Sequence, residues 1–303
     1  MILKKQLTKV LLGRQRVYFL HHLAPFVQPR VYPIRDLHCS PMLCVVPKNL
    51  KGKGKPAQDW LTRQLNDPYV KKSRYENYRA RSAYKLIEID AKYSILKPGM
   101  SIVDCGAAPG SWTQVAVQRV NADGKMEGCK RFLQGTVIAL DIIPFEPVQH
   151  AICLPEMNIF SEECTEKLAS IMMARSGSND FNKSSFVDVV LSDMCPSASG
   201  HKEIDHDNVI KLCYAALKFT VLHLVTGGTF LCKIWRGRRE TDLCQDLKNL
   251  FENVRYVKPP ASRDDSAEIY LLAQNFRGIE NKYESPFNKQ TRSSGSVGTK
   301  IVL

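Results

Sequence analysis

A strand, a glycine turn and a helix follow one another within residues 101–114, and this stretch constrains the fold more than any other. Ser101–Cys105 is a short apolar run that ends at a glycine, which indicates a buried strand. Gly106-Ala-Ala-Pro-Gly110 predicts a tight turn, and helical spacing continues from Ser111 to Val120. An open α/β sheet presents backbone N–H groups to a ligand in this way. An ordinary glycine-rich turn is the alternative interpretation.

The glycines do not follow the spacing of two familiar phosphate-binding loops. Asp104, Gly106 and Gly110 form D-x-G-x-x-x-G, and Gly-Lys-Ser/Thr does not follow. The pattern therefore disfavours both a dinucleotide fingerprint and a P-loop.

Strands and helices alternate along the rest of the chain. We expect strands over 135–140, 150–153, 186–191, 229–232, 254–257 and 268–273, and helices over 79–95, 161–173, 204–225 and 240–251. Ser161 is the expected N-cap of the second helix, and Thr226-Gly-Gly228 is expected to end the third. The last strand can return antiparallel after the turn 258–265. This alternation predicts an α/β sheet closed by a hairpin.

Most of the net charge of +13 lies at the N-terminus. Residues 1–55 hold eleven Lys and Arg and a single acid, Asp36, which leaves only +3 for the remaining chain. A basic, almost acid-free leader with scattered apolar residues is typical of a mitochondrial presequence, and an RNA-binding basic arm is the alternative. We therefore expect a targeting leader and linker over 1–55, a catalytic domain over 56–275 and a polar tail over 276–303.

The ten cysteines lie mostly in apolar runs, and no C-x-x-C pair occurs. We expect reduced thiols, no metal site and no membrane span. Residues 63–85 carry seven Lys or Arg among four tyrosines at 69, 75, 78 and 84. Cations and rings in this mixture favour unpaired RNA, and a solvated helix face is the alternative.

Four polar residues are expected at one edge of the sheet. Asp141 ends the second strand, where an acid can accept hydrogen bonds from ribose hydroxyls or can simply close a turn. Asp193 and Lys233 end the fourth and fifth strands, and Glu268 begins a strand of opposite direction. The carboxyl ends of parallel strands share one edge, so these groups should lie together beside the glycine turn.

Five motifs in this order resemble the FtsJ-like family of RNA 2′-O-ribose methyltransferases, which use S-adenosylmethionine (SAM). They are Arg81-Ser-Ala-Tyr-Lys-Leu86, Asp104-Cys-Gly-Ala-Ala-Pro-Gly-Ser-Trp112, Leu191-Ser-Asp-Met-Cys-Pro196, Gly228-Thr-Phe-Leu-Cys-Lys233 and Lys258-Pro…Ser-Arg263…Glu268. The resemblance covers residues 60–275. It implies a Rossmann-like SAM-dependent methyltransferase fold, with a mostly parallel seven-stranded sheet, one antiparallel strand and helices on both faces.

The resemblance also implies a site. The catalytic tetrad of the family corresponds to Lys85, Asp193, Lys233 and Glu268. The expected cofactor contacts are Gly106, Ala107, Ala108, Pro109, Gly110, Ser111, Trp112, Asp141, Asn158 and Asp193. An asparagine stands at 158 where the family has an acid, and Cys195 replaces the commoner alanine. With the leader, the resemblance points to a uridine ribose in mitochondrial large-subunit rRNA, free or within a preribosomal particle, and to a monomer in the matrix.

A ribose hydroxyl must lose a proton as it attacks the methyl group of SAM. Lys233 can accept that proton if its pKa is lowered, and a cation such as Lys85 would lower it. Two alternatives stay open at this point. One is a cap-type mRNA or tRNA 2′-O-methyltransferase, and the other is an rRNA-binding assembly factor whose catalysis is dispensable.

Overall fold

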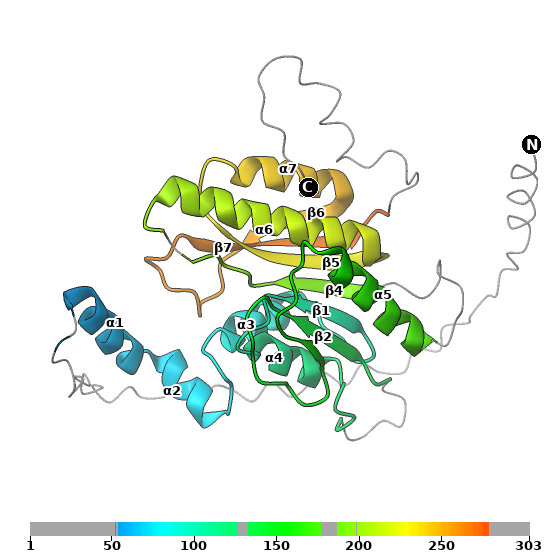
Figure 1. Cartoon of the computed structure of the whole chain (residues 1–303), viewed down its shortest axis with the longest axis horizontal. Helices are drawn as coiled ribbons and strands as arrows, with labels where there is room; N and C mark the ends of the chain where they lie inside the picture. Colours follow the sequence, from blue (N-terminus) through cyan, green and yellow to red (C-terminus); the bar gives the residue numbers. More distant parts are fainter. Residues whose placement is uncertain (1–51, 53, 127–132, 177–186, 198, 279–303) are drawn as a thin grey trace, which may run out of the picture. The chain divides into compact units, whose positions relative to one another are not determined.

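A computed structural model of the chain describes residues 52, 54–126, 133–176, 187–197 and 199–278. Within these residues seven strands form one sheet in the order β3-β2-β1-β4-β5-β7-β6 (Figure 1). The strands are β1 (Ser101–Cys105), β2 (Thr136–Leu140), β3 (Ile152–Leu154), β4 (Val187–Ser192), β5 (Leu224–Trp235), β6 (Phe251–Val257) and β7 (Glu268–Phe276). The helices are α1 (Lys55–Asn66), α2 (Pro68–Tyr75), α3 (Ala83–Tyr93), α4 (Ser111–Arg119), α5 (Glu162–Ser176), α6 (Lys202–His223) and α7 (Glu240–Leu250).

The strand directions confirm the expected fold class. Strands β1, β2, β3, β4 and β5 pair in parallel, whereas β7 runs antiparallel to both β5 and β6. The last strand therefore enters between two strands that precede it in the sequence. This insertion brings the start of β7 to the edge at which β4 and β5 end.

Helices cover both faces of the sheet (Figure 1). Side chains of α5, α6 and α7 pack with one set of strand residues, such as Val103, Ile138 and Val190. Side chains of α3 and α4 pack with the alternate set, such as Ile102, Val137 and Leu191. Successive strand residues face opposite sides, so a strand covered on both sides reads as a continuous apolar run. All five residues of β2 are buried for this reason.

The largest correction to the predicted elements concerns β5. The sequence predicts a turn at Gly227-Gly228 and a strand that ends at Lys233, but β5 begins at Leu224 and continues to Trp235. Its pairing with β4 shifts register between Val187 and Val189, and Gly227 adopts a φ of +85°. These glycines accommodate an irregular strand instead of ending a helix. At the other end, pairing with β7 extends the strand two residues beyond Lys233.

Other boundaries differ by a few residues. The helix predicted from residue 79 begins at Ala83, and the short third strand spans 152–154 instead of 150–153. Ser161 caps α5 as expected, because its Oγ accepts a hydrogen bond from the Cys164 N–H at 3.2 Å. Nearly all of the leader and of the polar tail, and residues 127–132, lie outside the described residues, while α1 begins at Lys55 and Phe276 closes β7.

Candidate active site

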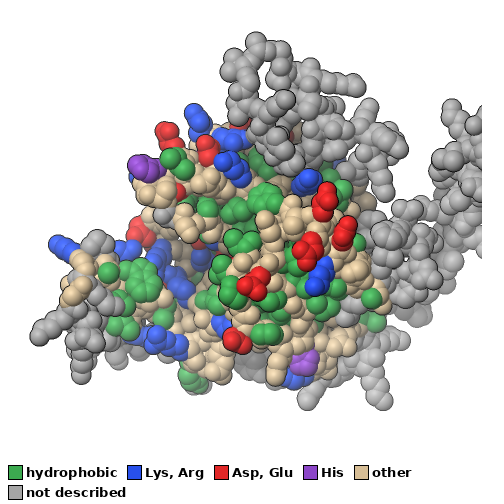
Figure 2. Space-filling model, viewed as in Figure 1, with side chains coloured by type: hydrophobic (Ala, Val, Ile, Leu, Met, Phe, Trp, Pro, Cys, Tyr) green, Lys and Arg blue, Asp and Glu red, His purple; other side chains and the backbone are tan. Residues whose placement is uncertain are grey.

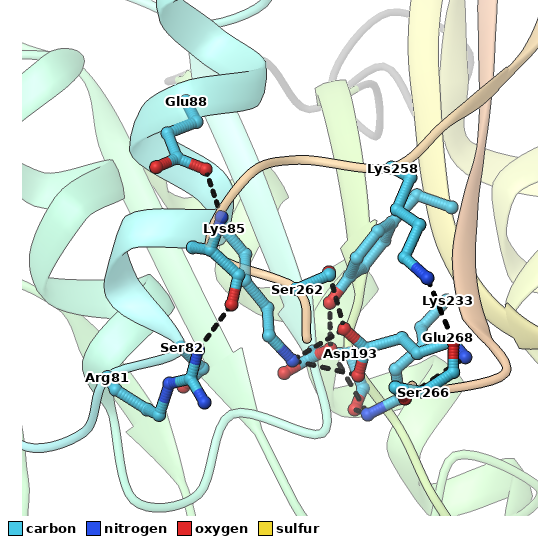
Figure 3. Close-up of polar contacts among 12 residues, drawn as sticks. Arg81, Ser82, Lys85, Glu88, Asp193, Lys233, Lys258, Ser262, Ser266 and Glu268 are labelled. Atoms are coloured by element: carbon cyan, nitrogen blue, oxygen red, sulfur yellow. Dashed lines mark hydrogen bonds and ion pairs between the residues drawn. The ribbon is translucent and has the colours of Figure 1, made fainter. Parts of the chain in front are cut away.

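Four ionisable side chains from four elements meet at the carboxyl edge of the parallel strands (Figure 3). Asp193 follows β4, Lys233 lies near the end of β5, and Glu268 is the first residue of β7. Lys85 reaches the same place from the first turns of α3. The structure thus brings together all four residues of the expected tetrad. Their side chains are between 8 and 16 % exposed.

The four groups form two ion pairs. The Lys85 ammonium lies 2.6 Å from Oε1 and 2.8 Å from Oε2 of Glu268. The Lys233 ammonium lies 3.1 Å from Oδ1 of Asp193 and donates to the main-chain oxygen of the same residue at 2.5 Å. Each amine is therefore held by a carboxylate, and the pairs are shielded from bulk water on most sides. Such pairs keep their geometry better than exposed ones do.

The charges around Lys233 contradict the expectation of a lowered pKa. Burial lowers the pKa of the Lys233 ammonium, but the negative charges of Asp193 and Glu268 and the hydrogen bond to Asp193 outweigh burial and raise the pKa overall. The expected effect of Lys85 fails because this cation pairs with Glu268, so two carboxylates dominate the field at Lys233. The amine is accordingly a stable ammonium at neutral pH.

Tyr270 supports the second ion pair and was not predicted from the sequence. Its hydroxyl donates to Oδ1 of Asp193 at 2.9 Å, and its ring is completely buried against Trp112. Burial, together with the charges of Asp193 and Glu268, raises the pKa of this hydroxyl far above its ordinary value. Tyr270 lies two residues after Glu268 and opposite Lys233 in the β5–β7 ladder. The period of two along a strand was the signal that could have identified it.

The turn between β6 and β7 supports Glu268. Ser262 is buried, and its Oγ donates to Oε1 of Glu268 at 2.8 Å. The preceding residue, Ala261, is fixed to α3 because its N–H donates to Oε2 of Glu88 at 2.6 Å and its carbonyl accepts from the Arg81 guanidinium. Figure 3 shows Arg81 and Glu88 on either side of Lys85 along the same stretch of chain. Contacts between residues 173 and 180 positions apart leave no local pattern in the sequence.

The glycine turn forms a second region of the same edge. Gly106 and Gly110 adopt φ values of +77° and +108°, which side chains other than glycine rarely tolerate. A Cβ on Gly106 would lie 2.5 Å from Cγ of Met194, and one on Gly110 would lie 2.7 Å from both Arg79 and Val148. Both its positive φ and the close approach of Arg79 and Val148 therefore exclude any residue other than glycine at position 110.

Helix α4 begins directly after this turn with several N–H groups directed along its axis. The first intrahelical bond is donated by Gln114 to Gly110, so the N–H groups of Ser111, Trp112 and Thr113 precede the regular ladder. Asp141 lies beside the turn, where Oδ2 accepts from the Ala108 N–H at 2.9 Å and Oδ1 accepts from the Ile143 N–H at 3.1 Å. Donors at a helix N-terminus next to a carboxylate fit a zwitterionic, ribose-bearing cofactor such as SAM.

Two expected cofactor residues turn their side chains elsewhere. The Trp112 indole donates to the Ser82 carbonyl at 2.8 Å and is 2 % exposed, and the Ser111 Oγ lies 2.7 Å from the Ser82 Oγ. Their backbone N–H groups are what they can offer to a ligand. Ala107, Ala108 and Pro109 form the turn itself, with a cis Ala108–Pro109 bond. Asn158 is exposed, and its Oδ1 accepts from the Phe160 N–H at 3.0 Å.

Asp104 lies beneath the turn as a completely buried carboxyl group on β1. Burial raises its pKa to about 7, against a hydrogen bond from Thr113 that lowers it. Its Oδ2 accepts from the Thr113 Oγ at 2.7 Å, while Oδ1 has no hydrogen-bond partner among the described residues. No group of three metal-ligating side chains occurs within the described part of the chain. None of the helices described there is long and apolar enough to cross a bilayer.

The tyrosines of residues 63–85 are mostly not available for stacking on bases. Tyr69 and Tyr78 contact the buried ring of Tyr84 at centroid distances of 5.4 and 5.8 Å. Their hydroxyls donate to Glu88 and Gln118. These three rings form a small core between α2, α3 and α4, which corrects the prediction that they face RNA. Tyr75 differs, because it is 88 % exposed.

The mostly parallel sheet, the glycine turn after β1 and the acid after β2 form the Rossmann-like fold expected of SAM-dependent methyltransferases. The chain belongs to the FtsJ-like methyltransferase family, whose sequence profile matches residues 78–276. The protein is thus an enzyme that takes its methyl group from SAM.

Individual relatives agree with this assignment. The chain is 44 % identical over 232 residues to "rRNA methyltransferase 2, mitochondrial" of Drosophila melanogaster, which covers 77 % of this chain and 88 % of the relative. It is 44 % identical to "Ribosomal RNA large subunit methyltransferase E" of Parvibaculum lavamentivorans, over 80 % of this chain and 89 % of the relative. A crystal structure of a Plasmodium falciparum protein described as a ribosomal RNA methyltransferase superposes with a TM-score of 0.55 and 29 % identity, covering 67 % of this chain and 100 % of that one.

Proposed function

We propose that this protein methylates the 2′-hydroxyl of a uridine ribose in mitochondrial large-subunit rRNA. The observation that carries the proposal is the pair of ion pairs, Lys85–Glu268 and Lys233–Asp193, beside the glycine turn. The names of the relatives support large-subunit rRNA as the substrate, and one of them is mitochondrial. The matrix is therefore the compartment that we propose, with the rRNA free or in a preribosomal particle and the enzyme as a monomer.

In the proposed reaction the tetrad binds and deprotonates the ribose. Lys85 and Glu268 would hold the sugar hydroxyls, since both keep polar atoms at the edge of the site. Lys233 would release one proton to solvent, contact the 2′-oxygen as a neutral amine and accept the proton of that hydroxyl. Asp193, fixed by Tyr270, would keep the Lys233 amine directed at that oxygen.

The cofactor would occupy the edge between the glycine turn and Asp141. SAM supplies a methyl group already activated by the sulfonium, so no metal is needed to activate it. We assign Gly106, Ala107, Ala108, Pro109 and Gly110 to the turn that approaches it. Ser111 and Trp112 would contribute backbone N–H groups, Asp141 the ribose contact, and Asn158 an amide at the adenine.

Cations that could hold the RNA gather on one side of the molecule. Figure 2 shows Lys and Arg side chains over α1 and α2 and in the hollow between these helices and the sheet domain. A separate cavity of about 230 Å³ lies beside the tetrad, lined by Arg81, Lys85, Arg263 and Glu268 among others. Asp67, which joins α1 to α2, pairs with Arg81 at 2.6 Å and with Arg263 at 3.2 Å. A phosphate backbone could follow this hollow to the tetrad.

The decisive experiment maps 2′-O-methyl groups on mitochondrial rRNA in cells that lack the protein and are complemented with variants. The wild type is expected to restore one uridine methylation, and Lys233→Ala is expected to restore none. Lys233→Arg should also fail, because a guanidinium stays protonated at any working pH. Normal methylation without the protein would refute the proposal. If Lys233→Ala restores ribosome assembly but not methylation, the chain acts mainly as an assembly factor.

A further inference from the structure

Arg79 lies in the short segment between α2 and α3, and its guanidinium donates hydrogen bonds to three backbone carbonyls. Nη1 donates to the Pro109 carbonyl at 2.8 Å and also to the Glu146 carbonyl. Nη2 donates to the Pro147 carbonyl at 2.7 Å. Three acceptors spread around one planar fork suit a guanidinium, whose donors sit on separate nitrogens at fixed positions, better than the single nitrogen of an ammonium.

These carbonyls belong to two segments that follow adjacent strands. Pro109 is in the glycine turn after β1, whereas Glu146 and Pro147 lie in the segment after β2. Asp141 holds the N–H side of the same turn through Ala108. Arg79 therefore fixes the carbonyl of Pro109, next to the N–H of Ala108 that Asp141 holds, so two neighbouring residues in the middle of the turn are tied to the segment after β2.

The position of Arg79 is itself prepared by α4. Its backbone N–H donates to Oε1 of Gln114 at 2.9 Å, and Nε2 of Gln114 donates to the Asn77 carbonyl at 3.0 Å. The side chain then passes over Gly110, where a Cβ would lie 2.7 Å from Nη1 and 3.4 Å from Cδ. The missing side chain at Gly110 is what leaves room for this crossing.

We propose that Arg79 is a positioning residue for SAM: it joins the glycine turn to residues 146–147 and so sets the width of the cofactor edge. In the sequence this arginine belongs to a cationic stretch that resembles an RNA-binding surface. Its donors are directed at carbonyls instead, and a phosphate would have to displace them. The inference rests on the cofactor edge proposed above.

The test compares Arg79→Ala, Arg79→Lys and Arg74→Ala in the full chain. Calorimetry gives the dissociation constant of SAM, and methyl transfer gives KM for SAM and for rRNA. Loss of charge-assisted hydrogen bonds at Arg79→Ala should weaken SAM binding about tenfold or more, with KM for rRNA changed less than about threefold. Arg79→Lys should recover little. Arg74→Ala removes a cation of α2, five residues before Arg79, and should bind SAM as the wild type does.

Two outcomes would overturn the inference. Wild-type SAM affinity in Arg79→Ala, with weaker rRNA binding and a salt dependence reduced by about one charge, would make Arg79 an RNA contact. A lower melting temperature with unchanged SAM affinity, measured well below the transition, would leave it a merely structural residue. Wild-type SAM affinity in Gly110→Val would instead refute the proposed cofactor edge, because a side chain at Gly110 would occupy it.

Discussion

At the scale of single residues, the site depends on which partner each charged group has. Lys233 lies beside two carboxylates and keeps its proton. Burial favours the neutral carboxyl of Asp104 and raises its pKa to about 7. Both effects are set by neighbours distant in sequence. A lysine in this state can bind an oxygen at neutral pH, but it must first be deprotonated to act as a base.

The pH dependence of methyl transfer follows from this arrangement. Because the pKa of Lys233 is raised, the fraction of neutral amine grows about tenfold for each pH unit from pH 7 upward. The logarithm of the single-turnover rate at saturating SAM and rRNA, plotted against pH, should rise with a slope near one and reach no plateau below about pH 10. Circular dichroism at each pH is the control for unfolding. A plateau near neutrality would show that Lys233 is not the proton acceptor.

At the scale of elements, the turn between β6 and β7 connects α3 to the tetrad through hydrogen bonds. Glu88 accepts from Tyr69 and from the Ala261 N–H, and the next residue, Ser262, holds Glu268. Few of these partners are close in the sequence. The turn is therefore positioned by tertiary contacts and not by its own conformational preference.

Substitution of Glu88 should show whether the turn positions Glu268 for catalysis or only contributes to the stability of the fold. Glu88→Ala removes both acceptors, so we expect kcat to fall about tenfold while the SAM dissociation constant stays within about twofold of wild type. Glu88→Gln is the matched control, since its amide oxygen can still accept from Ala261, and it should keep most of the rate. If kcat of Glu88→Ala equals that of the wild type while its melting temperature falls, the turn does not position Glu268.

The order and type of the elements could be predicted because each strand is an apolar run bounded by turn residues. The tetrad followed from strand ends and motifs. The extent of β5 could not be predicted, since glycine in isolation favours a stop and only pairing with β4 and β7 makes it strand. The roles of Arg79 and Tyr84 were likewise hidden. An arginine and a tyrosine look the same in sequence whether they meet RNA, a carbonyl or another ring.

At the scale of the whole molecule, the charge is divided between two parts of the chain. Residues 1–55 carry +10 of the net +13. After residue 55, some of the remaining cations lie on α1 and α2, namely Arg63, Lys71, Lys72 and Arg74. The proposed function would use these two groups of cations differently, the leader for import and the cations of α1 and α2 for the RNA.

A reporter fusion tests the use of the leader. Residues 1–55 attached to a fluorescent protein should reach the mitochondrial matrix, and residues 54–303 attached to the same reporter should remain in the cytosol. Confocal microscopy with a matrix marker gives the readout. A diffuse signal from the first fusion would instead favour the alternative in which residues 1–55 bind RNA.

The antiparallel strand β7 has a consequence for how the enzyme comes into being. Synthesis proceeds from the N-terminus, and β7 must enter between β5 and β6 after both have left the ribosome. Glu268 and Tyr270 arrive with it, so a nascent chain that ends before residue 268 lacks half of one ion pair and the support of the other. The catalytic centre is therefore completed by the last of the described strands, and methyl transfer can begin only once β7 is in place.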